Sequence, residues 1–488
     1  MKFLLLPILL LCSMVSLHAQ IKNADFETRL DSTSLLPVGW GFQKLQGFTA
    51  SLDTAEKHSG KYAFAITNAD STAAGFLSIS QVVPVTITGL KKIAVTVYIK
   101  TKDLKGSVAI WSQLWDSNNK QIGFQNSGMQ GMSLAGNNDW KQYKLNLTVN
   151  KDVKKLLLGT YLAGTGSVWF DDYSIEESQK SNEPPTSVVT KYINEFIHIV
   201  KSNSIYKDSL NWANINQDIA EFSKGMKTID DARDLTSYMM TKLRQAGDNH
   251  SFIQPPVVAE KYAAQNTSLV KSSSKLIGKN IGYIAVPAFG SVNQQAQDDF
   301  ANDMQNKIRE LDTKHAIDSW IVDLRANGGG NMYPMIAGLG PLAGDGILGY
   351  FVTPENKKQR DAPWFYNYKK AKNGSSLGVK IIKPYQIKNP VARIAVLIGQ
   401  KTASSGEMTA ISFIGRPNTR TFGQPSGGFT SANSGFKLSD GSMLQLAVSY
   451  TADRNKKEYR GKIQPEVIII EVAGEDATLK AAQEWLLK

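Results

Sequence analysis

The sequence predicts a multidomain protein in which an all-β module is followed by a helical segment and an α/β core. Three observations predict this order. The chain has 488 residues, too many for one compact core. Its first third contains short runs of β-branched and aromatic residues separated by turn-forming residues, whereas apolar residues later recur at helical spacing. From residue 281 onward, strand-like and helix-like segments alternate.

The composition is that of an ordinary globular protein. Hydrophobic residues make up 42% of the chain and charged residues 20%, which are average values. The formal net charge is +12, but Lys and Arg are spread along the chain and form no tract. Because a nucleic-acid-binding protein would need a basic stripe or a known motif, we expect no nucleic-acid partner.

Residues 1–19 have the pattern of an export signal. Lys2 gives a basic start, an apolar run of about 15 residues follows from Phe3 to Leu17, and the small residue Ala19 suits cleavage. The run is shorter than the roughly 20 apolar residues of a membrane helix, and no later stretch qualifies, so we expect no membrane span. The only cysteine, Cys12, lies in this signal. We therefore expect a periplasmic or extracellular protein that uses neither a thiol nucleophile nor thiolate metal ligands.

A β-sandwich is expected over residues 20–177. Residues 167–175 alternate like a strand, and together with residues 23–27 and 37–40 they resemble the ends of galactose-binding-like jelly-roll modules. Five of the nine tryptophans fall in this module. They either fill the core of the sandwich or form a face that binds a glycan or a peptide, and the sequence leaves both interpretations open.

Two further regions follow. A polar linker is predicted at 178–187, where two prolines adjoin. A helical subdomain is expected over 188–250, because apolar residues recur every three or four positions over 188–205 and 215–246. The α/β domain then covers 251–488. Its strands are expected at 281–286, 319–324 and 394–398, and its helices at 296–311 and from about residue 404.

Three glycines follow the second of these strands. Gly328, Gly329 and Gly330 let the main chain approach another group closely and adopt positive φ. The segment lacks the lysine of a P-loop and the glycine spacing of a dinucleotide site. Its N–H groups therefore suit an oxyanion hole, where they stabilise a developing negative charge.

A serine stands at the next strand-to-helix turn. Ser404 follows the strand at 394–398 and precedes an apolar helix, so free N–H groups surround it. Serine is also a common helix N-cap, and this segment alone does not separate a nucleophile from a cap.

One histidine is the strongest candidate for a general base. The chain has five histidines, one of them in the predicted signal. His58 lies in the β-module, His198 is expected in the middle of a helix and buried in the core, and His315 is expected at the surface. His250 stands in a polar turn after a long amphipathic helix, which suits a base near neutral pH. A role in capping the turn is the alternative.

Residues 188–472 resemble the C-terminal-processing, or tail-specific, serine peptidase family, including its tricorn-core relatives. The matching segments occur in the family's order at 247–251, 282–289, 323–330, 402–407, 423–428, 438–441 and 459–466. The resemblance implies an α/β core of the ClpP/crotonase-like type and hydrolysis of polypeptide substrates without a cofactor or metal. It also implies Ser404 as the nucleophile, with an oxyanion hole formed by Ser405, Gly328 and Gly329.

The sequence departs from the tail-specific branch at the base. That branch uses a lysine in the Gly-rich turn downstream of the serine, and Phe429 stands there instead. The tricorn-like branch uses a histidine from the upstream turn, where His250 lies. We therefore predict a Ser–His pair, with Lys401 as the fallback base.

An acidic partner for the histidine is expected late in the domain, as in the tricorn-like branch. Glu458 is the first choice, ahead of Glu466 and Asp453. The PDZ domain of the family is expected to be absent, because the residues between the His250 turn and the next predicted strand are too few to form it.

The sequence thus predicts an exported serine endopeptidase with Ser404 as nucleophile and His250 as general base. One alternative is a non-proteolytic ligand- or glycan-binding protein on the same scaffold. The other is a hydrolase of a different acyl substrate, although the Gly-x-Ser-x-Gly motif of α/β-hydrolases is missing around Ser404.

Overall fold

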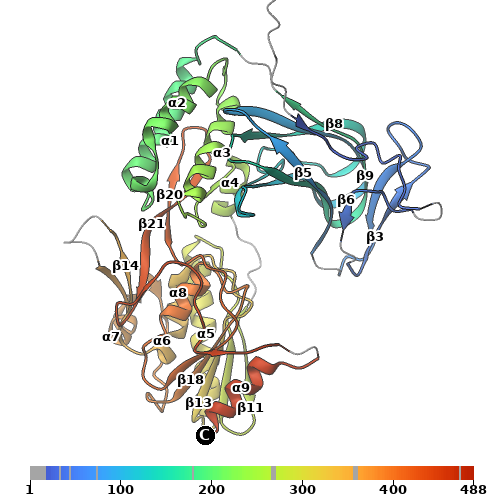
Figure 1. Cartoon of the computed structure of the whole chain (residues 1–488). Helices are drawn as coiled ribbons and strands as arrows, with labels where there is room; N and C mark the ends of the chain where they lie inside the picture. The colour runs from blue at the N-terminus through green and yellow to red at the C-terminus, as the bar shows by residue number, and fades with distance from the viewer. Residues whose placement is uncertain are drawn as a thin grey trace, which may run out of the picture. The chain divides into compact units, whose positions relative to one another are not determined.

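The computed structural model describes residues 18–31, 35–42, 45–72, 75–177, 181–264, 271–354, 361–471 and 474–488 (Figure 1). The predicted export signal therefore lies outside the described residues except for its last two, and so does the start of the predicted linker. The chain divides into two compact units. The first contains Met1–Phe196 and Leu210–Ala246, and the second contains Ile197–Ser209 and Gly247–Lys488.

The first unit is rich in β-structure, as predicted, and contains a nine-stranded sheet. Its strands are β1 (His18–Ala19), β2 (Gly41–Phe42), β3 (Phe48–Asp53), β4 (Ala63–Asn68), β5 (Phe76–Thr86), β6 (Lys91–Trp115), β7 (Gln121–Asn126), β8 (Gly136–Val149) and β9 (Lys155–Glu177). Buried and exposed side chains alternate along β5, and Leu77, Ile79, Val83 and Val85 lie on the buried face.

Two long strands organise this sheet. β6 and β9 pair antiparallel along most of their lengths. β8 and β4 pair with one half of this ribbon, and β7 and β5 with the other. The ribbon changes register near Gly106 and Gly164, where a side chain at either position would lie within 2.3 Å of a carbonyl oxygen on the facing strand. One hydrophobic core contains residues of both halves, such as Phe64 and Ile79.

Three helices follow in the chain: α1 (Ser187–Asn203), α2 (Trp212–Phe222) and α3 (Ile229–Gln245). The helical pattern breaks between α2 and α3, where Gly225 has a φ of +78° and Thr228 forms a capping box with Asp231. In the structure these helices are divided between the two units rather than forming one of their own. His198 lies within α1, as expected, but the expectation that it is buried in the core is wrong, since its side chain is exposed.

The second unit is an α/β structure. Its helices are α4 (Pro256–Ala264), α5 (Gln294–Lys314), α6 (Met332–Ala343), α7 (Tyr368–Asn373), α8 (Ser405–Ile411) and α9 (Ala477–Leu486). Its strands are β10 (Phe252–Gln254), β11 (Ser273–Ile277), β12 (Ile281–Ala285), β13 (Ser319–Asp323), β14 (Gly346–Val352), β15 (Asp361–Tyr366), β16 (Ser375–Ser376), β17 (Val379–Lys380), β18 (Arg393–Ile398), β19 (Thr419–Gly423), β20 (Ala432–Lys437), β21 (Met443–Asp453), β22 (Glu458–Tyr459) and β23 (Val467–Ile468). The predicted strands at 281–286, 319–324 and 394–398 and the helix at 296–311 are confirmed.

A six-stranded sheet in the order β11-β12-β13-β18-β19-β23 forms the centre of this unit. All neighbours from β12 to β23 are parallel. Because successive side chains point to opposite faces, Trp320 and Val322 pack into the core with α5, α6 and α8, while Ile321 packs with α9. Parallel strands that are covered on both faces consist of nearly continuous apolar residues. These strands can therefore be recognised clearly in the sequence.

A second sheet of this unit has the order β10-β21-β14-β15, with β20 and β22 also paired to β21. It places the residues just before β10 beside the residues just before β20, since both strands pair with β21. The described helices include none long and apolar enough to cross a membrane.

Candidate active site

Ser404 occupies a strained main-chain position at the end of the loop that follows β18. Its φ of 52° and ψ of −120° lie outside the regions that non-glycine residues normally adopt. Such a conformation costs about 1–3 kcal/mol and persists only where the surroundings impose it. The side chain is thereby presented at the N-terminus of α8, partly accessible to solvent.

His250 lies in a tight turn after α3 that is held by a buried carboxylate. Asp248 is 2% exposed, and its Oδ1 accepts hydrogen bonds from the N–H groups of His250 at 3.0 Å and Ser251 at 2.9 Å. The turn brings the His250 Nε2 atom to 3.0 Å from Ser404 Oγ. The two side chains that the sequence singled out therefore meet within one unit.

The other ring nitrogen determines the tautomer of this histidine. His250 Nδ1 lies 2.9 Å from the main-chain carbonyl oxygen of Ser431 and 3.1 Å from its Oγ. A carbonyl oxygen can only accept, so Nδ1 carries the proton. In the neutral ring Nε2 is then unprotonated and accepts the hydrogen bond that Ser404 Oγ–H donates.

The environment of His250 favours the neutral imidazole. Burial lowers the pKa of His250 below its ordinary value of 6.5, while the Ser431 carbonyl and the charge of Asp248 act in the opposite direction. The Phe429 ring packs 5.5 Å from the imidazole between centroids and contributes to this apolar surrounding. The ring is therefore able to accept a proton at neutral pH.

Asn327 joins the glycine turn to the serine loop. This residue is fully buried; its main-chain oxygen accepts a hydrogen bond from the N–H of Ala403 at 3.0 Å, and its Oδ1 accepts one from Gly329 at 3.0 Å. Gly329 has a φ of +109°, and a Cβ there would lie 2.9 Å from the Cβ of Ser404. Only glycine fits this close approach, so the turn lies directly against the serine.

The three predicted oxyanion donors differ in availability. The Gly329 N–H is engaged by Asn327. Among the described residues, neither the Gly328 N–H nor the Ser405 N–H has a hydrogen-bond acceptor. Gly328 is also exposed, whereas Gly329 is buried. Of the three predicted donors, the N–H groups of Gly328 and Ser405 are therefore the unoccupied ones.

A buried carboxylate binds the main chain of Ser404 and of a neighbouring turn. Glu407 is fully buried; it accepts hydrogen bonds from the N–H groups of Ser404, Gly428 and Phe429, each at 2.8 Å, and from the Ser426 hydroxyl. Burial raises the pKa of Glu407, and these four hydrogen bonds counter that effect. Since all four partners donate, the ionised carboxylate is the form that fits.

The two lysine alternatives are not at the serine. Phe429 occupies the place where the tail-specific branch has its lysine, and its main chain is tied to Glu407. Lys401 is exposed and makes no hydrogen bond to Ser404. The imidazole of His250 is the basic side chain that lies within hydrogen-bond distance of Ser404 Oγ.

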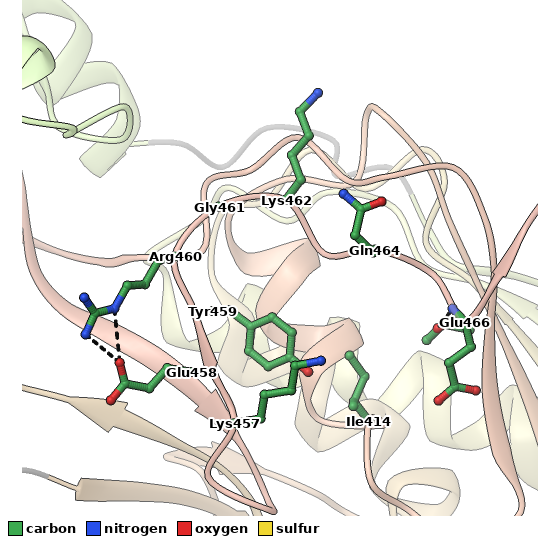
Figure 2. Close-up of a pocket in the computed structure, with 10 residues that line it drawn as sticks. Ile414, Lys457, Glu458, Tyr459, Arg460, Gly461, Lys462, Gln464 and Glu466 are labelled. Atoms are coloured by element: carbon green, nitrogen blue, oxygen red, sulfur yellow. Dashed lines mark hydrogen bonds and ion pairs between the residues drawn. The ribbon is translucent and has the colours of Figure 1, made fainter.

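The acidic candidates lie away from the imidazole. The Glu458 carboxylate pairs with the Arg460 guanidinium at 2.7 Å, and Figure 2 shows the two side chains turned toward each other at one side of a pocket. None of the hydrogen bonds of the His250 ring involves Glu458, Glu466 or Asp453. The position next to Nδ1 is taken by the main chain of Ser431.

Sequence reasoning assigned no role to four of these residues, namely Asp248, Asn327, Glu407 and Ser431. The first three lie inside the matched segments. An acid or amide next to a turn that carries a candidate site residue was the sequence feature that could have indicated them. Ser431 acts through its carbonyl, which every residue has, so its type carried no signal. Among the described residues, no group of three or more His, Cys, Asp or Glu side chains is arranged to hold a metal ion.

Similar proteins place this site in a known family. A family model described as Peptidase family S41 matches residues 280–469. The nisin-resistance protein of Lactococcus lactis subsp. lactis is 31% identical over 278 residues, which cover 57% of this chain and 82% of that protein.

Solved structures with a similar fold include a lipoprotein from Streptococcus agalactiae, with 25% sequence identity and a TM-score of 0.51 over 62% of this chain and 97% of that one. The photosystem II D1 C-terminal processing protease has a TM-score of 0.42 and 12% identity over 61% of this chain and 97% of its own. The family model spans the segments that carry the glycine turn and Ser404, and the similarity to the Lactococcus protein extends over most of that protein's length. The chain therefore belongs to peptidase family S41.

Proposed function

We propose that the protein is an exported serine endopeptidase that hydrolyses peptide bonds with Ser404 as nucleophile and His250 as general base. The observation that carries the proposal is the pair of hydrogen bonds on the His250 ring. Nδ1 donates to the Ser431 carbonyl at 2.9 Å, and Nε2 lies 3.0 Å from Ser404 Oγ. This is the arrangement in which an imidazole removes a hydroxyl proton.

The reaction proceeds through an acyl-enzyme. As Ser404 Oγ attacks the scissile carbonyl carbon, its proton moves to His250 Nε2, and the carbonyl oxygen becomes an oxyanion. The free N–H groups of Gly328 and Ser405 stabilise this oxyanion. The imidazolium then protonates the leaving amine, and a water molecule, activated by the same imidazole, releases the acyl group.

The main-chain carbonyl of Ser431 takes the orienting role that an acidic side chain has in a catalytic triad. It selects the Nδ1–H tautomer and fixes the ring plane, as second-sphere partners of histidine generally do. Glu458, the predicted acidic member, is bound to Arg460 and has no such contact. We therefore propose a Ser–His pair with a main-chain acceptor in place of the predicted Glu458.

Glu407 is a positioning residue in this scheme. Its carboxylate ties the Ser404 N–H to the turn that contains Gly428 and Phe429, and that turn leads directly to Ser431. One buried charge therefore connects the main chain of the nucleophile to the group that orients the base. Hydrogen bonds to a charged group contribute about 1.5–3 kcal/mol each, which is enough to maintain the strained conformation of Ser404.

The remaining expectations from the sequence belong to the same proposal. Residues 1–19 serve as an export signal, so the enzyme acts in the periplasm or outside the cell. Residues 20–177 form a jelly-roll sandwich of the galactose-binding-like type, and 251–488 form a catalytic core of the ClpP/crotonase-like type. The polypeptide substrate follows from membership of a peptidase family.

A second function is supported by one face of the β-rich unit. Trp111, Gln113 and Trp115 alternate along β6 and so point to the same side of the sheet. The Trp111 indole donates to Ser78 Oγ at 2.8 Å, and the Trp115 indole to Gln113 Oε1 at 3.1 Å. Phe124 on β7, which pairs with β6, is 36% exposed, and Phe76 on β5, which pairs with β9, is 60% exposed. Aromatic rings interleaved with amide and hydroxyl groups match the apolar faces and hydroxyls of a sugar ring, so we propose that this face binds a glycan.

Replacement of either member of the pair should abolish peptide hydrolysis. Ser404→Ala removes the nucleophile and His250→Ala the base, and each is expected to lower kcat by about 10⁴-fold or more, because the two residues act as one unit. His198→Ala, at an exposed histidine, is the matched control. Labelling with a fluorophosphonate tests the same point, since a non-proteolytic protein on this scaffold would not react. Wild-type turnover in Ser404→Ala would end the proposal.

The pH dependence of kcat/KM should show the lowered pKa of His250. Protonation of His250 removes the base, so activity is lost as the pH falls through the pKa of the ring. Because burial lowers that pKa, the midpoint of the acid limb is expected below 6.5. The measurement is kcat/KM from mildly acidic to neutral pH. An acid limb centred above 6.5 would contradict the neutral, buried imidazole.

Glu407→Gln should reduce turnover more than substrate binding. The amide replaces one acceptor oxygen with an NH₂ group that faces main-chain N–H donors, so Ser404 and the Phe429 turn shift slightly. Misplacement of this kind costs about 100-fold in kcat, whereas KM is expected to change by less than about threefold because Glu407 does not contact the substrate. Glu466→Gln, at an exposed carboxylate, is the control. A purely structural role for Glu407 would be assigned if the loss of kcat were fully explained by a lower fraction of folded protein and the folded fraction were labelled normally by the fluorophosphonate.

Substitutions on the aromatic face test whether it binds a glycan. Trp111→Ala and Trp115→Ala should each weaken binding to polysaccharide by roughly tenfold, because each removes a stacking platform. Affinity electrophoresis in gels that contain a panel of polysaccharides measures this effect. Trp140→Ala, at a half-buried tryptophan on β8, serves as the control. If the wild-type protein migrated equally in gels with and without each polysaccharide, the proposal that this face binds a glycan would be wrong.

A further inference from the structure

A second recess opens at the edge of the central sheet that carries Ser404. It is an open pocket of about 480 Å³ at the carboxyl ends of β12 and β13, bounded also by the loop after β18. Its lining includes the charged residues Lys271, Asp323, Arg325 and Lys401 and the apolar stretch from Ala285 to Pro287. In open parallel sheets, ligands bind at this edge, outside the carboxyl ends of the strands.

The acidic groups around this pocket are already bound within the protein. Asp323 accepts hydrogen bonds from the Arg325 guanidinium at 2.7 Å and from the Tyr283 hydroxyl at 2.8 Å. The other side of the guanidinium pairs with Asp476 at 2.6 Å. Arg325 is therefore a fixed wall of the pocket, held between two carboxylates, and its charge is balanced.

The positive charges of the two lysines in the pocket are not balanced by acidic partners among the described residues. Within the described part of the chain, neither Lys271 nor Lys401 has a hydrogen-bond or ion-pair partner. Both are exposed, so their ammonium groups are free to meet a ligand that enters the pocket. The apolar side chains of Ala285, Val286 and Pro287 line the same recess and suit an aliphatic stem.

The pocket is anchored to the catalytic loops. Lys401 precedes Ser404 by three residues in a loop that is fixed by the hydrogen bond from Thr402 Oγ1 to the Leu324 carbonyl at 2.8 Å. Ala326 precedes the free donor Gly328 by two residues. Three residues of extended chain span at most about 11 Å. A peptide held at Ser404 therefore reaches the pocket with a residue within about three positions of the cleaved bond.

We propose that this recess, the basic pocket, binds a carboxylate of the peptide substrate through Lys401 and Lys271. The proposal deepens the proposed peptidase function and rests on it. The carboxylate is either the side chain of a glutamate or aspartate close to the cleaved bond or the terminal carboxylate of the peptide. An apolar wall beside two ammonium groups selects an anion on a short aliphatic stem over a neutral or cationic residue.

The test uses fluorogenic peptides in matched pairs that carry Glu or Gln at each position within three residues of the cleaved bond, each made with a free acid and an amide terminus. The wild-type protein is expected to cleave the carboxylate-bearing member of one pair with about tenfold higher kcat/KM, a preference of about 1.4 kcal/mol. Lys401→Glu should remove or invert this preference, measured as the ratio of kcat/KM for the two members of the pair. Lys369→Glu makes the same charge change on α7, outside the pocket, and should keep the preference.

Each outcome decides a different point. A preference that appears only between Glu and Gln assigns the pocket to a side chain, and one that appears only between acid and amide assigns it to the peptide terminus. Equal cleavage of both members of every pair, or an equal loss for both in Lys401→Glu, overturns the basic pocket. Fluorophosphonate labelling of Ser404 in the same samples separates this from failure of the peptidase. A protein that is labelled but shows no preference lacks only the pocket, whereas an unlabelled and inactive protein lacks the proposed function as well.

Discussion

The chemistry of this site depends on a hydrogen bond from an imidazole to a main-chain carbonyl. The Ser431 oxygen holds His250 Nδ1–H, and that contact alone decides that Nε2 faces Ser404 as an acceptor. A carboxylate in the same place would also stabilise the imidazolium, whereas a carbonyl offers only a dipole. The neutral ring is therefore favoured, in agreement with the lowered pKa of His250. In the proposed mechanism, the positive charge that forms on the ring during attack is balanced chiefly by the developing oxyanion.

That hydrogen bond keeps its geometry only if the turn around Ser431 is held in place. The buried carboxylate of Glu407 holds this turn. Glu407 binds the turn that leads to Ser431 and also the main chain of Ser404. A buried carboxylate is costly unless it is fully hydrogen-bonded, and here four donors surround it. The strain at Ser404, the glycine at 329 and the buried Asn327 belong to the same arrangement, because each allows two loops to approach more closely than ordinary side chains would permit.

The sequence predicted the parts of this arrangement that depend on residue type. Buried parallel strands read as apolar runs, so the strands that end before Gly328 and Ser404 were found within one residue at either end. His250 was found because few histidines compete with it. The helix break near Gly225 and the exposure of His198 were missed, since helical periodicity shows neither the exact break nor which partner covers a face. The contact of Ser431 was beyond prediction because a carbonyl acceptor has no signature, and Glu458 was chosen by position along the chain rather than by distance in space.

Parallel topology explains why so much of the chemistry gathers at one edge. β12, β13 and β18 run side by side in the same direction, so the loops at their carboxyl ends must meet. Those loops carry the apolar wall at Ala285 to Pro287, the glycine turn, and the segment from Lys401 to Ser404. The antiparallel sheet supplies the histidine from a different part of the chain, through the pairing of β10 and β20 with β21. The loops around Ser404 and the proposed basic pocket therefore share the same rigid strands. This shared support is the reason to propose that a peptide held in the pocket is oriented for attack by Ser404.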